Sequence, residues 1–313
     1  MTAITEQDRA PHAPFAVHEA LRVVPLRTPT LPPATHTNCV VAGRREVVVI
    51  DPASPYADQQ KHLLDWMEAS SVRLHAILLT HHHGDHVAGA NALREATGVP
   101  VLAHPATTER LEGHVRVDGA LYEGDLVSEA ISVDLGLDLR VLHTPGHARG
   151  HLAFRDERTA ALVAGDLVAG QGTIVIDPPE GDMADYLATL ARLVQLGTGT
   201  IIPAHGGAID PGEDKLLEYI GHRQMREEQL IAALEARPER AGRPIDLVPA
   251  IYPDVPPMFH PLAARQVLAH LLKLEQEARV DRPDGSTGVP GASLYMSASM
   301  AGWNAQLPVF RLR

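Results

Sequence analysis

The 313-residue sequence predicts an α/β (α+β) protein, a four-layer αββα sandwich with a small helical appendage at its carboxyl end. Strand-like and helical segments alternate through the first two thirds of the chain, which is typical of sheets with helices on their outer faces. The chain also has two similar halves, and in each half strands lead to His and Asp residues. After His205 the pattern becomes helical.

The first half predicts strands from apolar, β-branched runs and helices from apolar positions repeating at helical spacing. A turn at 43–45 joins two of the strands into a hairpin. The expected strands are 21–26, 38–42, 46–51, 76–79 and 101–103, and the expected helices are 56–68 and 90–97.

The second half repeats this plan. A strand-like pattern over 131–141 leads to His147, and a hairpin formed by 152–154 and 160–164 ends at Asp166. Asp182 is expected to cap a helix that contains 186–194, because Asp accepts hydrogen bonds from the first turn. A short strand at 201–202 ends at His205.

Four regions are expected along the chain: a flexible start (1–16), the sandwich domain (17–212), a helical extension (213–280) and a tail (281–313). The extension should hold helices at 214–236 and 262–277 and a short element at 244–251. The tail is rich in Gly, Ser, Ala and Pro, which predicts a flexible segment or a cloning remnant, with a short ordered piece at 307–312.

The most informative stretch is 80–86, Thr-His-His-His-Gly-Asp-His, which directly follows the apolar run 76–79. Imidazoles and a carboxylate at the end of a buried strand are costly to desolvate unless something pairs with them, and a metal ion would. His81 and His83 point the same way and can share one ion, whereas Asp85 and His86 follow the Gly84 bend and can reach a second. His82 faces the other side. This donor set suits zinc, with iron or manganese as less favoured occupants.

Three later residues, His147, Asp166 and His205, each follow an apolar segment and lie in a turn marked by Gly or Pro. Loops at strand ends are common positions for site residues. A solvated His cluster or a purification tag is the plain alternative. The internal position argues against a tag, and the matching later residues argue against chance.

These residues resemble the motif of the metallo-β-lactamase superfamily, His-x-His-x-Asp-His followed by His, Asp and His, over about residues 38–205. The resemblance implies that Asp166 bridges two ions. It further implies that His81, His83 and His147 hold one ion and that Asp85, His86 and His205 hold the other. Ala88 departs from the usual Gly at that position, which should affect only a turn.

Within this superfamily the chain resembles the cytoplasmic endoribonuclease and thioesterase branch, which carries a C-terminal helical extension. His222, Arg223 and Arg226 lie in a run with counterparts there, and could meet an anionic substrate group or be solvated surface charges. Asp51 is either a turn cap or a partner that orients a metal-bound His, and the resemblance favours the second role. His151 could support the site from behind the ligands.

Composition limits the function classes. With 39 acidic and 27 basic residues the net charge is −12, so a broad nucleic-acid-binding face is not expected. The single cysteine, Cys39, excludes an intramolecular disulfide and is expected in the core. His104 and His114 are expected to be surface or capping residues. No signal peptide or membrane span is recognised, which predicts a soluble cytoplasmic protein.

Two divalent cations that share a water lower its pKa and polarise the attacked bond, so hydrolysis is the expected reaction. Asp85 would bind metal and orient the nucleophile. A small or carrier-bound ester or thioester is the favoured substrate, and RNA or another phosphodiester is the alternative. A β-lactam lacks support. An iron-dependent oxygenase or diiron protein on the same fold, and a non-catalytic scaffold, are further alternatives.

Overall fold

The computed structural model describes residues 13–288 and 307–313. Contacts between Cα atoms divide the chain into two compact units. Unit 1 contains residues up to 145 together with 149–174 and 192–216. Unit 2 contains 146–148, 175–191 and the chain from 217 onward.

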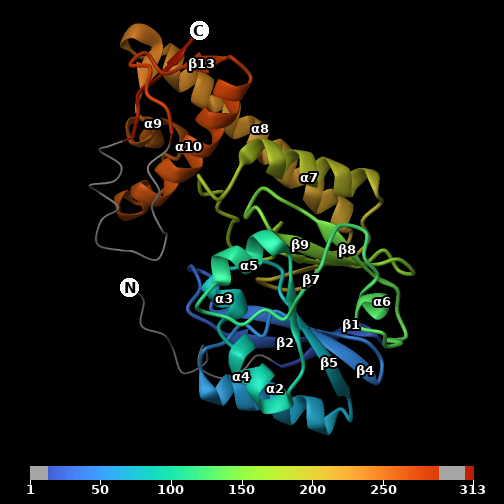
Figure 1. The fold of residues 1–313 in the computed structure, drawn as a ribbon. Coiled ribbons are helices and arrows are strands. Elements are labelled where there is room, and N and C mark those ends of the chain that lie inside the picture. Colours follow the sequence, from blue (N-terminus) through green and yellow to red (C-terminus); the bar gives the residue numbers. More distant parts are fainter. Residues whose placement is uncertain (1–12, 289–306) are drawn as a thin grey trace. The chain divides into compact units, whose positions relative to one another are not determined.

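Unit 1 contains a seven-stranded sheet in the order β1-β2-β3-β4-β5-β6-β7 (Figure 1). Its strands pair antiparallel from β1 to β4 and parallel from β4 to β7. Parallel pairing brings the carboxyl ends of β4 and β5 to the same edge of the sheet. The strands are β1 (Phe15–His18), β2 (Leu21–Arg27), β3 (His36–Ala42), β4 (Glu46–Ile50), β5 (Arg73–Leu78), β6 (Val101–Ala103) and β7 (Gly119–Ala120).

Strand β1 corrects the expected flexible start at its last two residues. Phe15 pairs with Val23 and Ala16 with Arg22, so β1 adds an antiparallel edge strand to the sheet. The side chain of Phe15 packs against the core. Residues 1–12 of the expected flexible start lie outside the described residues.

A second sheet in unit 1 has the order β11-β10-β9-β8, parallel between β10 and β11 and otherwise antiparallel. Its strands are β8 (Leu139–His143), β9 (Leu152–Asp156), β10 (Leu162–Gly165) and β11 (Ile201–Pro203). The expected strand over 131–141 is wrong over residues 131–138. Ser132 and Gly136 there have positive φ angles of 55° and 71°, which interrupt an extended backbone.

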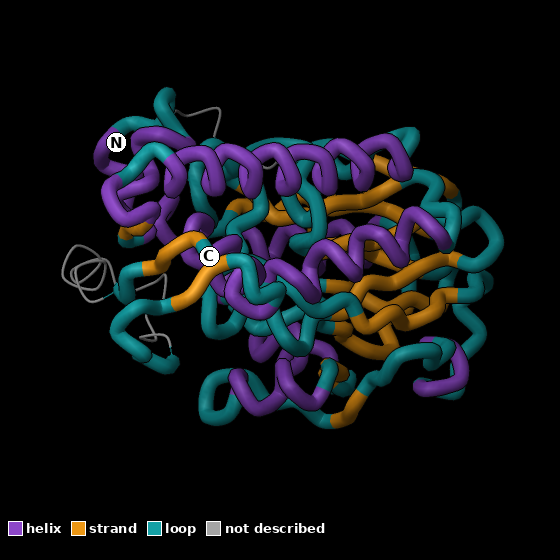
Figure 2. The backbone as a smooth tube through the Cα atoms, turned by 90° about the horizontal axis from the view of Figure 1, so that it is seen from above, coloured by secondary structure: helices purple, strands orange, loops and turns teal. Residues whose placement is uncertain are grey.

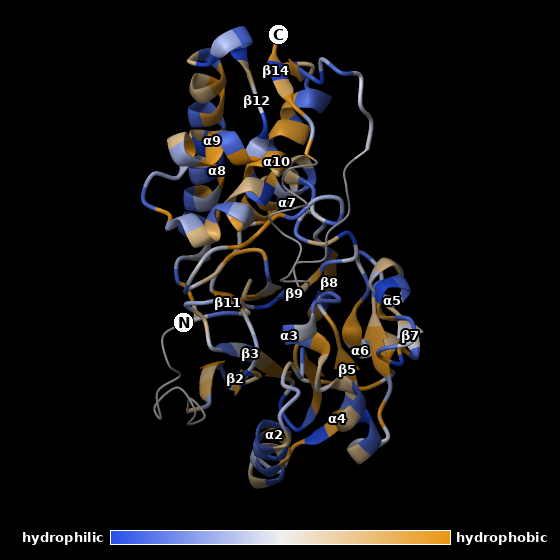
Figure 3. Cartoon of the chain, turned by 90° about the vertical axis from the view of Figure 1, so that its left-hand side faces the viewer, coloured by the Kyte–Doolittle hydropathy of each residue, from blue (hydrophilic) through white to orange (hydrophobic). Residues whose placement is uncertain are grey.

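The core of unit 1 has two layers of apolar side chains. One joins the facing sides of the two sheets and includes Val48, Leu78 and Phe154. The other covers the opposite side of the first sheet with Leu63 and Leu93 from two helices. In Figure 3 helix α2 is largely blue, whereas the sheet strands beside it are largely orange. The helices are α2 (Ala57–Ala69), α3 (Gly84–Val87), α4 (Ala90–Thr97), α5 (Pro105–Leu111) and α6 (Val127–Ala130).

Two longer helices, α7 (Met183–Gln195) and α8 (Gly212–Glu235), each have residues in both units. The Asp182 carboxylate accepts hydrogen bonds from the backbone N–H groups of Ala184 and Asp185 at 2.8 and 3.0 Å. The predicted capping of this helix by Asp182 is therefore confirmed.

The remainder of unit 2 combines helices with a small three-stranded sheet in the order β12-β14-β13, drawn in orange near the C label of Figure 2. The expected helical extension is present as helices, and the small sheet was not predicted from the sequence. Phe310 in β14 is fully buried, which confirms the ordered piece expected near the end of the chain. The expected flexible tail falls largely on 289–306, outside the described residues. The elements are η1 (Pro238–Arg240), β12 (Ala241–Gly242), α9 (Pro244–Ile251), η2 (Pro257–Phe259), α10 (His260–Gln276), β13 (Val280–Asp281) and β14 (Phe310–Leu312).

Among the described residues, every helix is too short or too polar to cross a lipid bilayer.

Candidate metal centre

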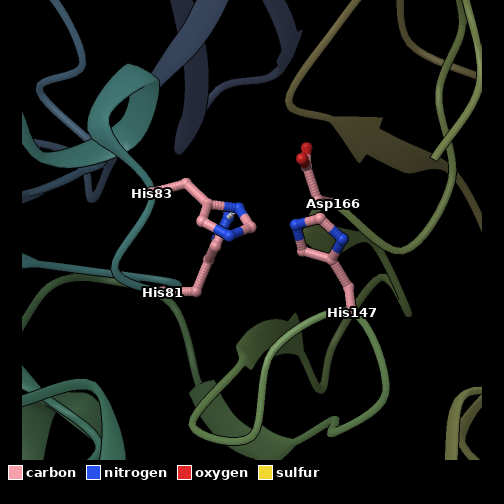
Figure 4. Close-up of side chains that lie close together, drawn as sticks. All are labelled: His81, His83, His147 and Asp166. Carbon is pink, nitrogen blue, oxygen red and sulfur yellow. Dashed lines mark hydrogen bonds between the residues drawn. The ribbon is translucent and has the colours of Figure 1, made fainter. Parts of the chain in front are cut away.

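All seven predicted ligands fall into two groups of side chains, each suited to one metal ion. Within each group the candidate ligand atoms lie within 4.8 Å of one another. In Figure 4 the four side chains of the first group point toward one another. The first group is His81, His83, His147 and Asp166, and the second is Asp85, His86 and His205.

The chain from the end of β5 through α3 supplies four of these ligands, two before the helix and two within it. His83 has extended backbone angles, φ −66° and ψ 145°, and precedes the first turn of α3. That turn carries Asp85 and His86 to the second group, as the Gly84 bend predicted. His82 is half-buried and belongs to neither group.

Asp166 and His205 follow the neighbouring parallel strands β10 and β11, so both emerge at one edge of the second sheet. Gly165 has φ +50°, and a Cβ atom there would lie 2.6 Å from Nε2 of His151. That ring nitrogen accepts a hydrogen bond from the backbone N–H of Asp166 at 3.1 Å. His151 therefore contacts the backbone of a predicted ligand, and its support of a metal site stays a prediction.

Three ligand imidazoles have their Nδ1 atoms fixed by an acceptor. His86 Nδ1 lies 2.8 Å from the Asp51 carboxylate, His147 Nδ1 lies 2.8 Å from the Val175 carbonyl, and His205 Nδ1 lies 2.9 Å from the His36 carbonyl. Since these oxygens only accept, each Nδ1 carries the proton and Nε2 presents its lone pair in the neutral ring.

Those lone pairs face carboxylate oxygens. Nε2 of His86 and Nε2 of His205 each lie 3.5 Å from Oδ1 of Asp166, and Nε2 of His205 lies 3.7 Å from Oδ2 of Asp85. Two acceptors at such distances repel each other unless a cation lies between them. Among the described residues, the buried Nε2 of His86 has no hydrogen-bond partner. The donor set therefore fits metal ions, and Asp166 faces both groups.

The electrostatic environment of His86 also favours a bound cation. Burial would lower the pKa of His86, but the carboxylates of Asp166 and Asp51 outweigh it and raise that pKa well above its ordinary value. Without a metal the pocket would hold a proton on this imidazole. A divalent cation satisfies the same carboxylates and leaves the ring neutral.

Asp51 connects the two strands that form this edge of the site. Its carboxylate accepts hydrogen bonds from the backbone N–H and the hydroxyl of Thr80, at 2.8 and 2.6 Å, as well as from His86. Asp51 is 3% exposed. This geometry favours the orienting role for Asp51 over a turn cap, and its effect on metal binding stays a prediction.

The three substrate candidates on α8 belong to neither metal group. Arg223 is buried, with its guanidinium 5.4 Å from the centre of the Tyr186 ring. Arg226 is half-buried and donates to the Ile251 carbonyl at 2.5 Å. His222 is exposed. The two arginines thus have intramolecular partners, and a substrate role for the three residues stays a prediction.

Several supporting groups were missed at the sequence level. Backbone carbonyls such as those of His36 and Val175 leave no signal in residue type. Asn38 could have been noticed as a polar residue inside a β-branched strand. Its side-chain amide donates to the carbonyls of Pro203 and Gly206 at 2.8 and 2.7 Å and so braces the loop that carries His205.

Three of the plainer predictions are confirmed. His104 caps α5, with its Nδ1 accepting from the backbone N–H of Ala106 at 3.2 Å. His114 is exposed, and Cys39 is fully buried.

A cavity of about 360 Å³ is lined by residues from the 13–38 part of the chain, by Gln171, and by the two glycines that follow His205. Its walls include Phe15, Asn38, Gln171 and Gly206. Among the described residues that line it there is no Lys, Arg, Asp or Glu. The cavity is therefore suited to an uncharged group.

Comparison with known proteins identifies the family. The model of the metallo-beta-lactamase superfamily matches residues 32–205, more than half of the chain, and the model of the beta-lactamase associated winged helix domain matches residues 244–288. The chain therefore belongs to the metallo-beta-lactamase superfamily, has its mixed sandwich of sheets with C-terminal helices, and is a metal-dependent hydrolase.

Individual proteins of similar sequence or structure support this family assignment. The lactamase-like protein aptB of Emericella nidulans is 30% identical over 259 residues, 80% of this chain and 79% of that protein. An atrochrysone carboxyl ACP thioesterase of Aspergillus chevalieri is 31% identical over 211 residues, 67% of this chain and 63% of that protein. A metallo-beta-lactamase family protein of Thermus thermophilus has a similar fold, with a TM-score of 0.70 at 23% identity over 95% of this chain and 100% of that one.

Proposed function

We propose that the chain is a dinuclear zinc hydrolase that cleaves a thioester or a small ester, with an acyl group on a carrier as the preferred substrate. The observation that carries this proposal is the pair of adjacent ligand groups, in which Asp166 of the first group lies 3.5 Å from His86 and from His205 of the second. The name of the Aspergillus chevalieri relative, a carboxyl ACP thioesterase, supports the thioester.

The roles of the residues follow from their positions. His81, His83 and His147 would hold one ion, Asp85, His86 and His205 the other, and Asp166 would contact both. Such ions lower the pKa of water toward neutrality and polarise the carbonyl. Asp85, which is 8% exposed, would orient the attacking water by accepting its hydrogen bond. Water oxygen then bonds to the acyl carbon, the C–S bond breaks, and the thiol leaves with a proton.

An RNA substrate is the second candidate, because the resembled branch includes endoribonucleases. Two observations speak against it. The net charge is −12, and the cavity lined by Asn38 and Gly206 has no Lys or Arg among its described lining residues. A polyanion would need cations along its path.

The cytoplasmic location remains a prediction.

The test compares an acyl thioester with a single-stranded RNA on the zinc-loaded full chain. We expect thioester turnover, a loss of at least about 100-fold in Asp85→Ala with zinc retained, and no RNA cleavage. RNA affinity that falls steeply with salt would overturn the choice of substrate. Metal analysis is the control, because about two zinc ions per chain agree with the proposal whereas one iron would favour an oxygenase.

A further inference from the structure

Arg265 in helix α10 is a fully buried cation, 1% exposed, that contacts one short segment of unit 2 at two points. Its Nε donates to Oδ1 of Asp177, and one of its terminal nitrogens donates to the carbonyl of Pro178 at 2.6 Å. Burying an ion pair has a large desolvation cost, so such a pair adds little net stability over an apolar pair of the same size. What the pair does provide is a fixed geometry, because a guanidinium binds two acceptors in one plane.

The contacted segment, residues 175–182, has neither helical nor strand structure of its own. Both of its ends hold the loop that carries His147. The Val175 carbonyl accepts the hydrogen bond from Nδ1 of His147 at 2.8 Å, and the backbone N–H of Asp182 donates to the Gly146 carbonyl at 2.8 Å. Arg265 contacts the segment between these two ends.

Helix α10 reaches the same segment a second time. The side-chain amide of Gln276 lies 3.3 Å from Oδ2 of Asp182. The segment lacks the hydrogen-bond ladder of a strand or helix. The contacts from α10 therefore add to the few hydrogen bonds that restrict it, such as the one from the backbone N–H of Gly181 to the Asp177 carbonyl at 2.8 Å. Arg265 lies 118 positions after His147, so these contacts bring a distant part of the chain to the segment that holds the His147 loop.

We infer that Arg265 is a positioning residue for His147: it fixes the segment whose Val175 carbonyl sets the orientation and tautomer of this imidazole. The inference rests on the proposed function in that His147 must be a metal ligand. A partner that orients a ligating His typically contributes 10- to 100-fold to metal affinity. Because His147 belongs to only one of the two ligand groups, the loss of Arg265 should weaken one metal ion and spare the other.

A matched control lies in the same unit. Arg282 is similarly buried, with 7% of its side chain exposed, pairs with Glu275 at 2.7 Å, and lies 5.2 Å from the centre of the Phe310 ring. No recorded contact joins it to residues 175–182 in the described parts of the chain. Its replacement removes a buried arginine of unit 2 without touching the support of His147.

The experiment measures the affinities of both zinc ions in the full-length protein, by titrating the zinc-free form against a competing chelator. The variants are Arg265→Met, Arg265→Lys and Arg282→Met. For Arg265→Met we expect one zinc ion to bind 10- to 100-fold more weakly while the other stays within about threefold of the wild type. Arg265→Lys should be intermediate, because an ammonium retains the charge but not the planar fork. Arg282→Met should change neither.

A second readout is the NMR signal of the ring Nδ1–H of His147 in the zinc-loaded protein, assigned by its absence in His147→Ala. This signal should shift or broaden in Arg265→Met and remain in Arg282→Met. Wild-type affinity for both ions in Arg265→Met, with an unchanged His147 signal, would overturn the inference. If that variant does not fold, the same two measurements on Arg265→Lys decide. Failure of the proposed substrate shows separately, as two bound zinc ions without thioester cleavage in the wild type.

Discussion

Asp51→Asn tests how the support of His86 sets metal affinity. The Asp51 carboxylate accepts three hydrogen bonds, from the backbone N–H of Thr80 at Oδ1 and from the Thr80 hydroxyl and His86 Nδ1 at Oδ2. Asparagine keeps one oxygen and replaces the other with an NH₂ donor. Whichever way the amide is turned, at least one buried donor then faces another donor.

The expected loss of stability follows from the number of buried donors left without an acceptor. An unsatisfied buried donor costs about 1–3 kcal/mol, so the free energy of unfolding of the zinc-free protein should fall by about that amount. Loss of the charge that holds the His86 tautomer should weaken the zinc ion at Asp85, His86 and His205 by about 10- to 100-fold. Zinc-loaded protein should therefore lose more stability than zinc-free protein, because binding to the folded state adds to stability.

The assay is urea unfolding with and without zinc, together with zinc titration against a chelator. The control is Asp156→Asn, which also removes a buried carboxylate, one that accepts from the Thr159 hydroxyl at 2.6 Å. This control should lose stability without losing zinc affinity. Equal and unchanged zinc affinities in the two variants would refute the role given to Asp51.

Three further predictions concern other parts of the chain. Burial, with nearby cations, lowers the pKa of His270 to about 3. The pKa of this imidazole in the unfolded chain is near 6.5, so its contribution to the free energy of unfolding is fully present above pH 6.5 and decreases as the pH falls toward 3. We expect the wild type to lose about 2–3 kcal/mol of unfolding free energy between pH 6.5 and 4.5, measured by urea unfolding. His270→Leu should lose this pH dependence. Gly146 has φ +132°, and a Cβ there would lie 2.3 Å from Cα of Tyr186. Gly146→Ala should therefore lower the free energy of unfolding by at least about 2 kcal/mol, measured by thermal unfolding. Gly221→Ala in α8, with open space around its Cβ, should raise it by up to about 1 kcal/mol. Removal of zinc by a chelator should abolish turnover, and zinc but not magnesium should restore it; recovery with magnesium would contradict the donor chemistry.

The side chains that meet in the two candidate ligand groups could be selected from the sequence because their chemistry is costly to bury. Four of them lie in one short run after an apolar strand, and the other three lie in turns after apolar segments. The strand expected at 131–138, which the structure lacks, could not be ruled out from the sequence. Its apolar alternation resembles a strand, and the positive φ of Ser132 depends on tertiary context rather than on residue type.

The supports of the ligands were harder to predict. The Val175 and His36 carbonyls act through backbone atoms that every residue has. Arg265 lies in a helix whose apolar positions are evident, yet its inward direction is visible only once Asp177 and Pro178 are placed beside it. Sequence patterns describe single elements well, whereas these contacts join residues more than 80 positions apart.

The burial of helix α10 also limits how the winged helix region could recognise a nucleic-acid sequence. In helix-turn-helix proteins the second helix must present one open side to enter the major groove of DNA. Residues 264–271 of α10 are all buried, which covers every side of two helical turns. These two turns have no free surface for base edges, so any nucleic acid that met this region would have to be recognised by other residues.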